Sequence, residues 1–151
     1  MKLYKSLIAL AVMGMAGSAM ASENCTINIK GDDRMQFDLK EATVSASCPE
    51  VIINLEHTGK LPVAAMGHNV VVSKTSDVAD LAKDAIKAGA ASGYLPEGDA
   101  RVIGATDMIG GGESSKATLS GSKLNAGEDY TFFCSFPGHS SMMKGTLKVV
   151  K

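Results

Sequence analysis

Short runs of alternating apolar and polar residues, separated by polar or glycine-rich turns, constrain the fold of this chain most strongly. The clearest is VIINLEH at 51–57, in which every second residue from Val51 to His57 points to one face of an extended strand. Further runs that favour strands lie at 25–30, 35–39, 43–46, 69–74, 101–105, 116–119, 130–134 and 145–150. Their number and spacing predict an all-β protein, a β-sandwich of two packed sheets.

One segment, residues 76–89, departs from this two-residue period. Its apolar residues recur at the three- and four-residue spacing of an amphipathic helix. They are Val78, Leu81, Ala82, Ala85 and Ile86. Ser76 is a plausible N-cap and Gly89 can end the helix. We therefore expect one helical insertion, packed by this apolar stripe against the sandwich.

The first 21 residues have the pattern of a secretory signal peptide. Lys2 and Lys5 precede an apolar run at 7–16, and small residues flank Met20. The run is too short for a lasting membrane span, and no later stretch approaches the roughly 20 apolar residues that one requires. We predict a signal peptide at 1–21 and a single exported domain at 22–151, located in the periplasm without a membrane anchor.

The charge of the exported part limits the partners that we expect. Removal of the predicted signal peptide leaves 13 basic and 16 acidic residues, a formal charge of −3. Nucleic acid is therefore not an expected partner. The weak net charge also argues against a partner that is strongly steered by long-range attraction.

The chain has three cysteines, and an exported protein is expected to pair them where it can. A bridge between Cys25 and Cys48 closes a loop of about 23 residues and stabilises the fold by about 3 kcal/mol in the chain-entropy model. We pair these two. Cys134 is then a lone thiol in an oxidising compartment, either buried and inert or held by a metal.

The segment CSFPGHSSMMKG at 134–145 concentrates residue types that bind metals. Cys134, His139 and Met143 follow the spacing C-x4-H-x3-M, which a tight loop can bring to one point. One thiolate, two imidazoles and a weak methionine form the arrangement of blue-copper sites, whereas structural zinc more often has several cysteines. A hydrolase with a Cys–His pair is an alternative. The second imidazole is either His57 or His68; the glycine that precedes His68 modestly favours the latter.

The segments MGHN at 66–69 and FFCSFPGHSSMMKGTLKV at 132–149 resemble the azurins, bacterial blue-copper proteins of the cupredoxin family. The resemblance extends over nearly all of the predicted domain, including the cysteine pair, RMQF at 34–37 and the helical insertion. It implies a cupredoxin-like Greek-key sandwich or barrel that binds one copper ion per chain. It also implies that Cys25 and Cys48 are bridged.

The resemblance implies a role for each residue around the metal. His68, Cys134 and His139 would be the strong equatorial ligands, Met143 a long axial ligand, and Gly67 would offer its backbone carbonyl on the opposite side. Backbone amides at Asn69 and Phe136 would donate hydrogen bonds to the cysteine sulfur, and the Asn69 side chain would tie the two ligand loops together. His57 would lie near the copper without binding it. Many azurins have a buried tryptophan where this chain has Val70.

The implied function is the transfer of single electrons, with no substrate bond made or broken, so we do not expect an enzyme. Electrons would enter and leave through His139, which an apolar patch would surround. This apolar patch consists of Met35, Leu61, Ala65, Met66, Phe136, Pro137 and Met142. The implied partners are redox proteins such as c-type cytochromes, a copper or haem reductase, or a peroxidase. Two alternatives remain open at this point: a module for copper storage or delivery, and a structural zinc-binding sandwich.

Overall fold

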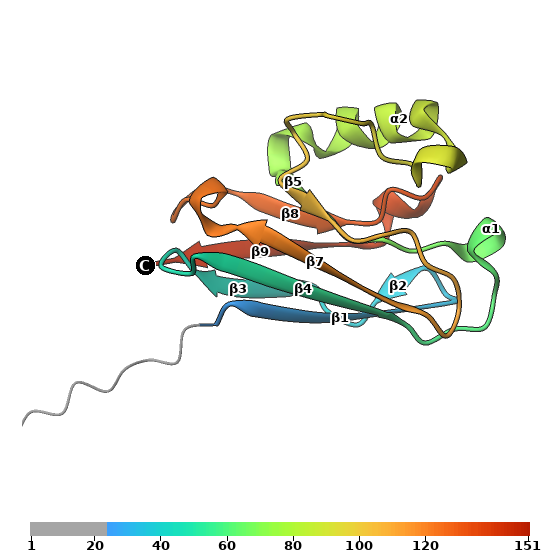
Figure 1. Ribbon diagram of the computed structural model, residues 1–151, viewed down its shortest axis with the longest axis horizontal. Coiled ribbons are helices and arrows are strands. Elements are labelled where there is room, and N and C mark those ends of the chain that lie inside the picture. The colour runs from blue at the N-terminus through green and yellow to red at the C-terminus, as the bar shows by residue number, and fades with distance from the viewer. Residues whose placement is uncertain (1–23) are drawn as a thin grey trace, which may run out of the picture.

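The computed structural model describes residues 24–151, which form two β-sheets packed face to face (Figure 1). One sheet has the order β2 (Gln36–Phe37), β1 (Thr26–Asp32), β4 (Glu50–His57) and β7 (Ser114–Ser120). The other has the order β3 (Glu41–Ser45), β9 (Lys144–Val150), β8 (Tyr130–Phe133), β5 (Val71–Lys74) and β6 (Gly104–Ala105). The predicted all-β sandwich is confirmed, and within these residues the two sheets do not join into a closed barrel. The predicted signal peptide lies outside the described residues.

The chain passes between the two sheets several times, which places strands that are distant in sequence side by side. It changes sheet after β2, β3, β4, β6 and β7. As a result β1 pairs in parallel with β4, and β3 pairs in parallel with β9, whereas the other neighbours are antiparallel. These crossed connections are typical of a Greek-key sandwich.

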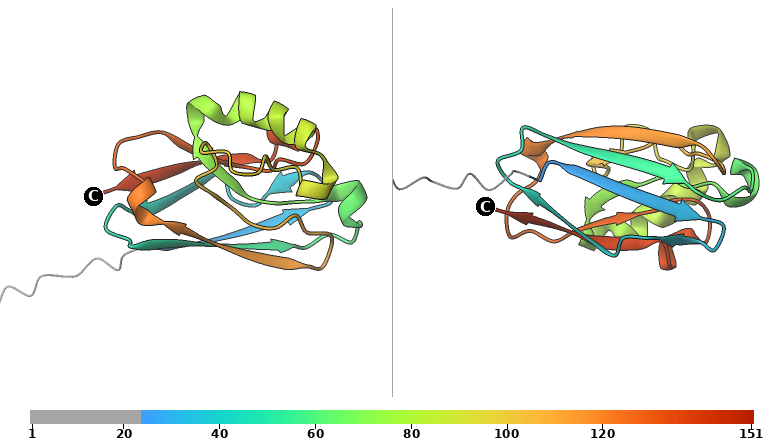
Figure 2. Two further views of the ribbon diagram at one scale, coloured as in Figure 1. Left: turned by 45° about the horizontal axis from the view of Figure 1, so that its top comes forward. Right: turned by 90° about the horizontal axis from the view of Figure 1, so that it is seen from below.

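The core lies between the sheets, where the alternating residues of the strands meet (Figure 2). In β4, Val51, Ile53 and Leu55 are buried, as the alternation predicted, and His57 is buried at the end of the same face. Val70 belongs to this core as well. The two-residue period of the sequence therefore determines which side chains face the opposite sheet.

Helix α2 (Val78–Ala88) covers the outer face of the second sheet (Figure 1). Leu81 contributes to a small separate core with Val71 and Phe133 from β5 and β8. Ile86, which we placed in the same apolar stripe, is 52% exposed, so the prediction is wrong for this residue. No helix among residues 24–151 is both long and apolar enough to cross a membrane.

The ends of α2 match the prediction in part. Gly89 ends the helix with a φ of +80°, a conformation that glycine adopts without strain. The N-cap is Asp77, with no side-chain capping bond, and a single 3₁₀ turn (Thr75–Asp77) precedes it. The assignment of Ser76 as the cap is therefore wrong. Its hydroxyl donates to the Asp77 carboxylate instead.

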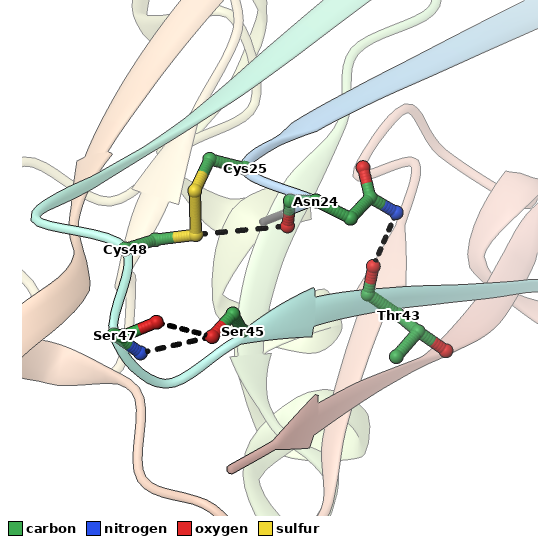
Figure 3. The surroundings of a disulfide bond; sticks show 6 residues. All are labelled: Asn24, Cys25, Thr43, Ser45, Ser47 and Cys48. Carbon is green, nitrogen blue, oxygen red and sulfur yellow. Dashed lines mark hydrogen bonds between the residues drawn. A yellow bond between two sulfur atoms is a disulfide. The ribbon is translucent and has the colours of Figure 1, made fainter. Parts of the chain in front are cut away.

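The two ends of the sandwich contain different elements of the chain. The short helix α1 (Val63–Met66) lies at one end and the C terminus at the other (Figure 1). A disulfide joins Cys25, just before β1, to Cys48, just before β4, which confirms the predicted pairing (Figure 3). Beside it, the Asn24 side chain donates to the Thr43 carbonyl at 2.7 Å. The bridge thus ties the first described strand to the rest of the fold, while Cys134 remains a free buried thiol.

Candidate metal centre

Two segments that are far apart in the sequence meet beyond the strands at the end occupied by α1. The first follows α1 and contains His68, which exchanges two backbone hydrogen bonds of 2.9 Å with Ile109. The second begins where β8 ends at Phe133, so that Cys134 is the next residue. Backbone pairing with Ile109 therefore fixes the position of His68, and the end of the buried strand β8 fixes the position of Cys134.

The second segment is a tight loop closed by its own backbone. Gly138 has a φ of +83° and precedes a 3₁₀ turn (His139–Ser141). The amide of Met143 donates to the His139 carbonyl at 2.8 Å, and the amide of Cys134 donates to the Met143 carbonyl at 2.9 Å. Cys134, His139 and Met143 are all buried as a result. The predicted spacing C-x4-H-x3-M does bring these three residues into one compact loop.

His68, Cys134 and His139 form a buried cluster whose ligand atoms all lie within 4.8 Å of one another. The Cys134 Sγ atom and the His139 Nδ1 atom are 3.7 Å apart. A sulfur about 2.3 Å and a nitrogen about 2.0 Å from one metal ion, at an angle of about 120°, are also about 3.7 Å apart. The separation of these two atoms therefore fits two ligands of one metal ion, and the His68 ligand atom lies within 4.8 Å of both.

The hydrogen bonds of His68 provide independent support for a cation at this point. Its Nε2 atom lies 2.8 Å from the Asp32 carbonyl, and its Nδ1 atom lies 2.9 Å from the Gly67 carbonyl. A neutral imidazole has only one N–H group and cannot donate to both. Burial lowers the pKa of His68, which opposes the doubly protonated form. With the proton on Nε2, the lone pair of Nδ1 faces a carbonyl oxygen, an arrangement that a cation between them would stabilise.

The environment of Cys134 is suited to a thiolate that a metal stabilises. Burial raises the pKa of the thiol to about 11, so without a metal it is protonated at neutral pH. The backbone amides of Asn69 and Phe136 donate to the sulfur and oppose this rise. Both amides were expected at the sulfur from the sequence resemblance. A metal-free Cys134 is thus an unreactive thiol, and its protein hydrogen bonds favour the charged form that a metal requires.

His139 is neutral at physiological pH. Burial, together with smaller contributions from repulsion by the neighbouring His68 and His57, lowers its pKa to about 4. The ring packs against Phe136, with centroids 4.6 Å apart, and lies 5.3 Å from the ring of His68. Its nitrogen lone pair is therefore available to a metal without loss of a proton.

Met143 and Gly67, the predicted axial groups, lie beside the cluster. The Gly67 carbonyl oxygen is 3.7 Å from the Cys134 sulfur. A Cβ atom added at Gly31 would lie 3.4 Å from the Met143 methyl and 2.8 Å from the His68 ring, so both side chains pack on this one glycine. The weak coordination by Met143 and Gly67 stays a prediction, whereas their proximity to the donors is observed.

His57 lies next to the cluster but outside it. Its ring stacks on that of His68, with centroids 4.1 Å apart and planes 12° from parallel. The Nε2 atom lies 2.9 Å from the Met66 carbonyl, and Nδ1 accepts a hydrogen bond from the Gly59 amide at 3.0 Å. Both nitrogens are therefore engaged, and His68 is the second imidazole of the cluster.

The two ligand segments are held together by a pair of reciprocal hydrogen bonds. The Asn69 carboxamide donates to the Ser135 hydroxyl at 2.8 Å and accepts from the Ser135 amide at 2.9 Å. The sequence indicated the role of Asn69 but not its partner. It also missed Gly31 and the Asp32 carbonyl, which approach His68 only because the end of β1 lies beside it. A glycine that breaks the alternation just before Asp32 was the one available signal.

The residues of the apolar patch have unequal exposure. Met142 is 50% exposed and Leu61 is 41% exposed, and Ala65 is also exposed. The other four, Met35, Met66, Phe136 and Pro137, are half-buried. Val63 in α1 is 43% exposed, an apolar residue that sequence reasoning did not include. Exposed apolar side chains therefore lie on two segments of the chain, the one around α1 and the loop that contains His139.

Comparisons with known proteins agree with this geometry. Residues 23–150 match the model of copper-binding proteins of the plastocyanin/azurin family. The chain is 50% identical to the azurin of Bordetella pertussis over 141 residues, which cover 93% of this chain and 94% of that protein. It is 57% identical to the azurin of Alcaligenes faecalis over 125 residues, which cover 83% and 98%. Among solved structures, an azurin of Methylomonas sp. strain J matches with a TM-score of 0.81 and 44% identity, covering 84% of this chain and 98% of that one.

Proposed function

The chain belongs to the plastocyanin/azurin family of copper-binding proteins, and from this premise we propose that it transfers single electrons between redox proteins as a blue-copper protein. The observation that supports this most directly is the buried cluster of one thiol and two imidazoles within 4.8 Å. This donor set suits copper because thiolate is a soft ligand and imidazole a borderline one. When bound, copper supplies the change between Cu(II) and Cu(I).

Each protein group has a distinct part in this proposal. His68, Cys134 and His139 would hold the metal, and Met143 and the Gly67 carbonyl, which lie beside these donors, would be additional weak ligands. Hydrogen bonds from two backbone amides to the Cys134 sulfur, and from His68 Nε2 to the Asp32 carbonyl, fix these ligands in place. Because the donors are held by the fold, little rearrangement accompanies the transfer of an electron. No substrate bond is made or broken.

His139 is the proposed route for the electron. His139 is 3% exposed as a whole residue and lies in the loop that also contains exposed Met142. The apolar patch allows a partner to approach this ring closely and to leave again after transfer. Brief redox encounters use small interfaces, below about 1,200 Å² of buried surface. Met142 therefore faces the partner, and Met143 faces the metal.

The proposed location is the periplasm, where the predicted signal peptide would direct the chain. The proposed partners are c-type cytochromes, a copper or haem reductase, or a peroxidase. One cluster of such donors among residues 24–151 supports one copper ion per chain, which favours a carrier over a storage module. Zinc can occupy the same donors, but the single thiolate favours copper.

The proposal is tested by direct electron exchange with a haem protein. The copper-loaded protein is reduced, freed of reductant and mixed with oxidised c-type cytochrome in a stopped-flow instrument. We expect one haem to be reduced for each chain, with loss of the haem's oxidised spectrum and recovery of the blue colour. The zinc-loaded protein is the matched control, since it has the same ligands but no accessible second oxidation state. Absence of haem reduction by the copper form, with the blue colour intact, would contradict the proposal.

A further inference from the structure

A groove of about 800 Å³ lies beside the metal loop, between α2 and the outer face of the second sheet. One wall is helical and includes Val78, Ala82 and Ile86. The opposite wall comes from the start of β9 and from Ser140 and Ser141, which follow His139 directly. The groove is distinct from the metal cluster and has no part in the function proposed above.

The helical wall contains Ile86, the one large apolar side chain of α2 that is exposed. Leu81 and Ala85 are fully buried against the sheet. Ile86, by contrast, is 52% exposed and lines the groove with Val78 and Ala82. An apolar side chain that covered Ile86 would remove its aliphatic surface from water, which is favourable. Val78 and Ala82 also pack partly against the small core of Leu81, Val71 and Phe133, whereas Ile86 lies outside that core and faces the groove.

The charges around this strip are of one sign. Among residues 24–151, the groove is lined by Lys40, Lys83 and Lys144 and by no aspartate or glutamate. Lys83 forms an ion pair with Asp80, but both side chains are at least 70% exposed, and such pairs contribute little. The groove is thus a locally basic site on a chain whose formal net charge is −1. Net charge alone hides this feature.

The groove is continuous with the apolar patch through the metal loop. The Lys40 ammonium donates to the Met142 carbonyl at 3.4 Å, which links the groove lining to an exposed residue of the patch. Ser141, on the same loop, donates its hydroxyl to the Gly138 carbonyl at 3.2 Å and keeps the groove wall in place. A molecule seated in the groove would therefore lie next to a partner docked over His139.

We propose that this groove binds an acidic segment of the redox partner, with carboxylates against Lys40 and Lys144 and an apolar side chain against Ile86. The inference rests on the proposed function, because it assigns the chemistry of the partner that meets His139. The apolar patch brings the redox centres together, and the groove orients the partner by opposite charge. Such complementarity mainly increases association rates and specificity, and salt weakens it.

The test uses a short synthetic peptide in which glutamates alternate with leucines, added to the isotope-labelled, zinc-loaded protein. We expect amide chemical shifts to change at Ile86, Ser140, Ser141 and Lys144, and the changes to disappear in about 0.5 M salt, where the Debye length falls below about 5 Å. A peptide with lysines in place of the glutamates should cause no such changes. The zinc form keeps this test independent of electron transfer.

Matched variants separate the groove from general charge effects. Lys40→Glu combined with Lys144→Glu should weaken peptide binding by about tenfold or more. Lys116→Glu combined with Lys123→Glu makes the same change in net charge on exposed lysines outside the groove and should leave binding unchanged. Ile86→Ser should weaken binding as well. If the double variant loses its fold, Lys144→Glu alone is used in its place. For every variant, an unchanged blue colour after copper loading shows that the metal loop is intact.

The possible outcomes decide the proposal. Binding that maps to the groove and is lost only in the groove variants supports it. Absence of binding, binding elsewhere, or equal loss in both pairs of charge variants would overturn it. Equal groove-dependent binding to vesicles of anionic phospholipid would overturn the assignment to a protein segment. Failure of electron exchange with the cytochrome, in contrast, would remove the proposed function and leave the peptide result standing.

Discussion

Uptake of copper by the metal-free protein should release close to one proton per chain at pH 7. The proton comes from Cys134, whose pKa is raised to about 11 by burial. With that pKa, only about one thiol in ten thousand is ionised at pH 7, so nearly every copper ion that binds must displace a thiol proton. Metal binding to this chain is therefore linked to pH mainly through one residue.

The histidines add little because burial keeps them neutral. His139, with its pKa lowered to about 4, is protonated in about one molecule in a thousand at pH 7. Burial also lowers the pKa of His68 below its ordinary value. The difference in proton release between buried histidines and histidines with ordinary pKa values is larger at pH 5.5. At that pH, two ordinary histidines would release about 1.8 protons in addition to that of the thiol. Here His139 contributes almost none, so the total stays below two.

The measurement is isothermal titration calorimetry of the metal-free protein with Cu(II) in two buffers of different ionisation enthalpy. The difference between the observed heats gives the number of protons released. Zn(II) is the control, because it binds the same donors and should release the same number. Between pH 7 and 9 the apparent affinity should rise about tenfold per pH unit, since one proton leaves. Release of about 1.5 protons or more at pH 7, or of nearly three at pH 5.5, would refute the assignment of the neutral histidines.

Three further changes test the fold and the metal surroundings. Replacing both bridged cysteines, Cys25→Ala with Cys48→Ala, should lower the free energy of unfolding by about 3 kcal/mol, measured by denaturant titration; a loss below about 1 kcal/mol contradicts the assigned role. Gly31→Ala places a methyl group 2.8 Å from the His68 ring, so it should lower copper affinity about tenfold or more, and an unchanged affinity would show that the ring moves freely. Met143→Leu removes only the proposed weak axial donor, so the blue colour should persist while the reduction potential rises. Loss of the colour, or an unchanged potential, would remove Met143 from the site.

The strands could be predicted because burial follows a local rule. Strands such as β1, β4 and β7 alternate buried and exposed residues, because only one of their faces packs on the other sheet. Strands β5 and β8 do not alternate in this way, because Val71 and Phe133 on their outer face are covered by α2. The helix was less predictable at one residue, since Ile86 has the spacing of a core residue but lies at the edge of the stripe. Its exposure depends on the tertiary packing of α2 on the sheet, which leaves Ile86 in the lining of a groove, and no local sequence pattern records that.

The metal site was predictable where its residues are close in sequence. Cys134, His139 and Met143 are brought together by a loop of ten residues that closes on its own backbone. The choice between His57 and His68 depends on how β4 and the segment after α1 lie relative to that loop, which the residues alone left open and the resemblance to the azurins resolved. The Asp32 carbonyl could not be predicted at all, because any residue has a carbonyl and only the tertiary structure places this one beside the imidazole.

Titration of the metal-free protein with Cu(II), followed by visible absorption, tests the central claim most directly. We predict an intense blue thiolate absorption that saturates at one copper ion per chain and disappears reversibly on reduction. His57→Gln should retain it, whereas Cys134→Ser should abolish it. A colourless complex would contradict the claim, as would a colour that His57→Gln removes and His68→Gln leaves unchanged.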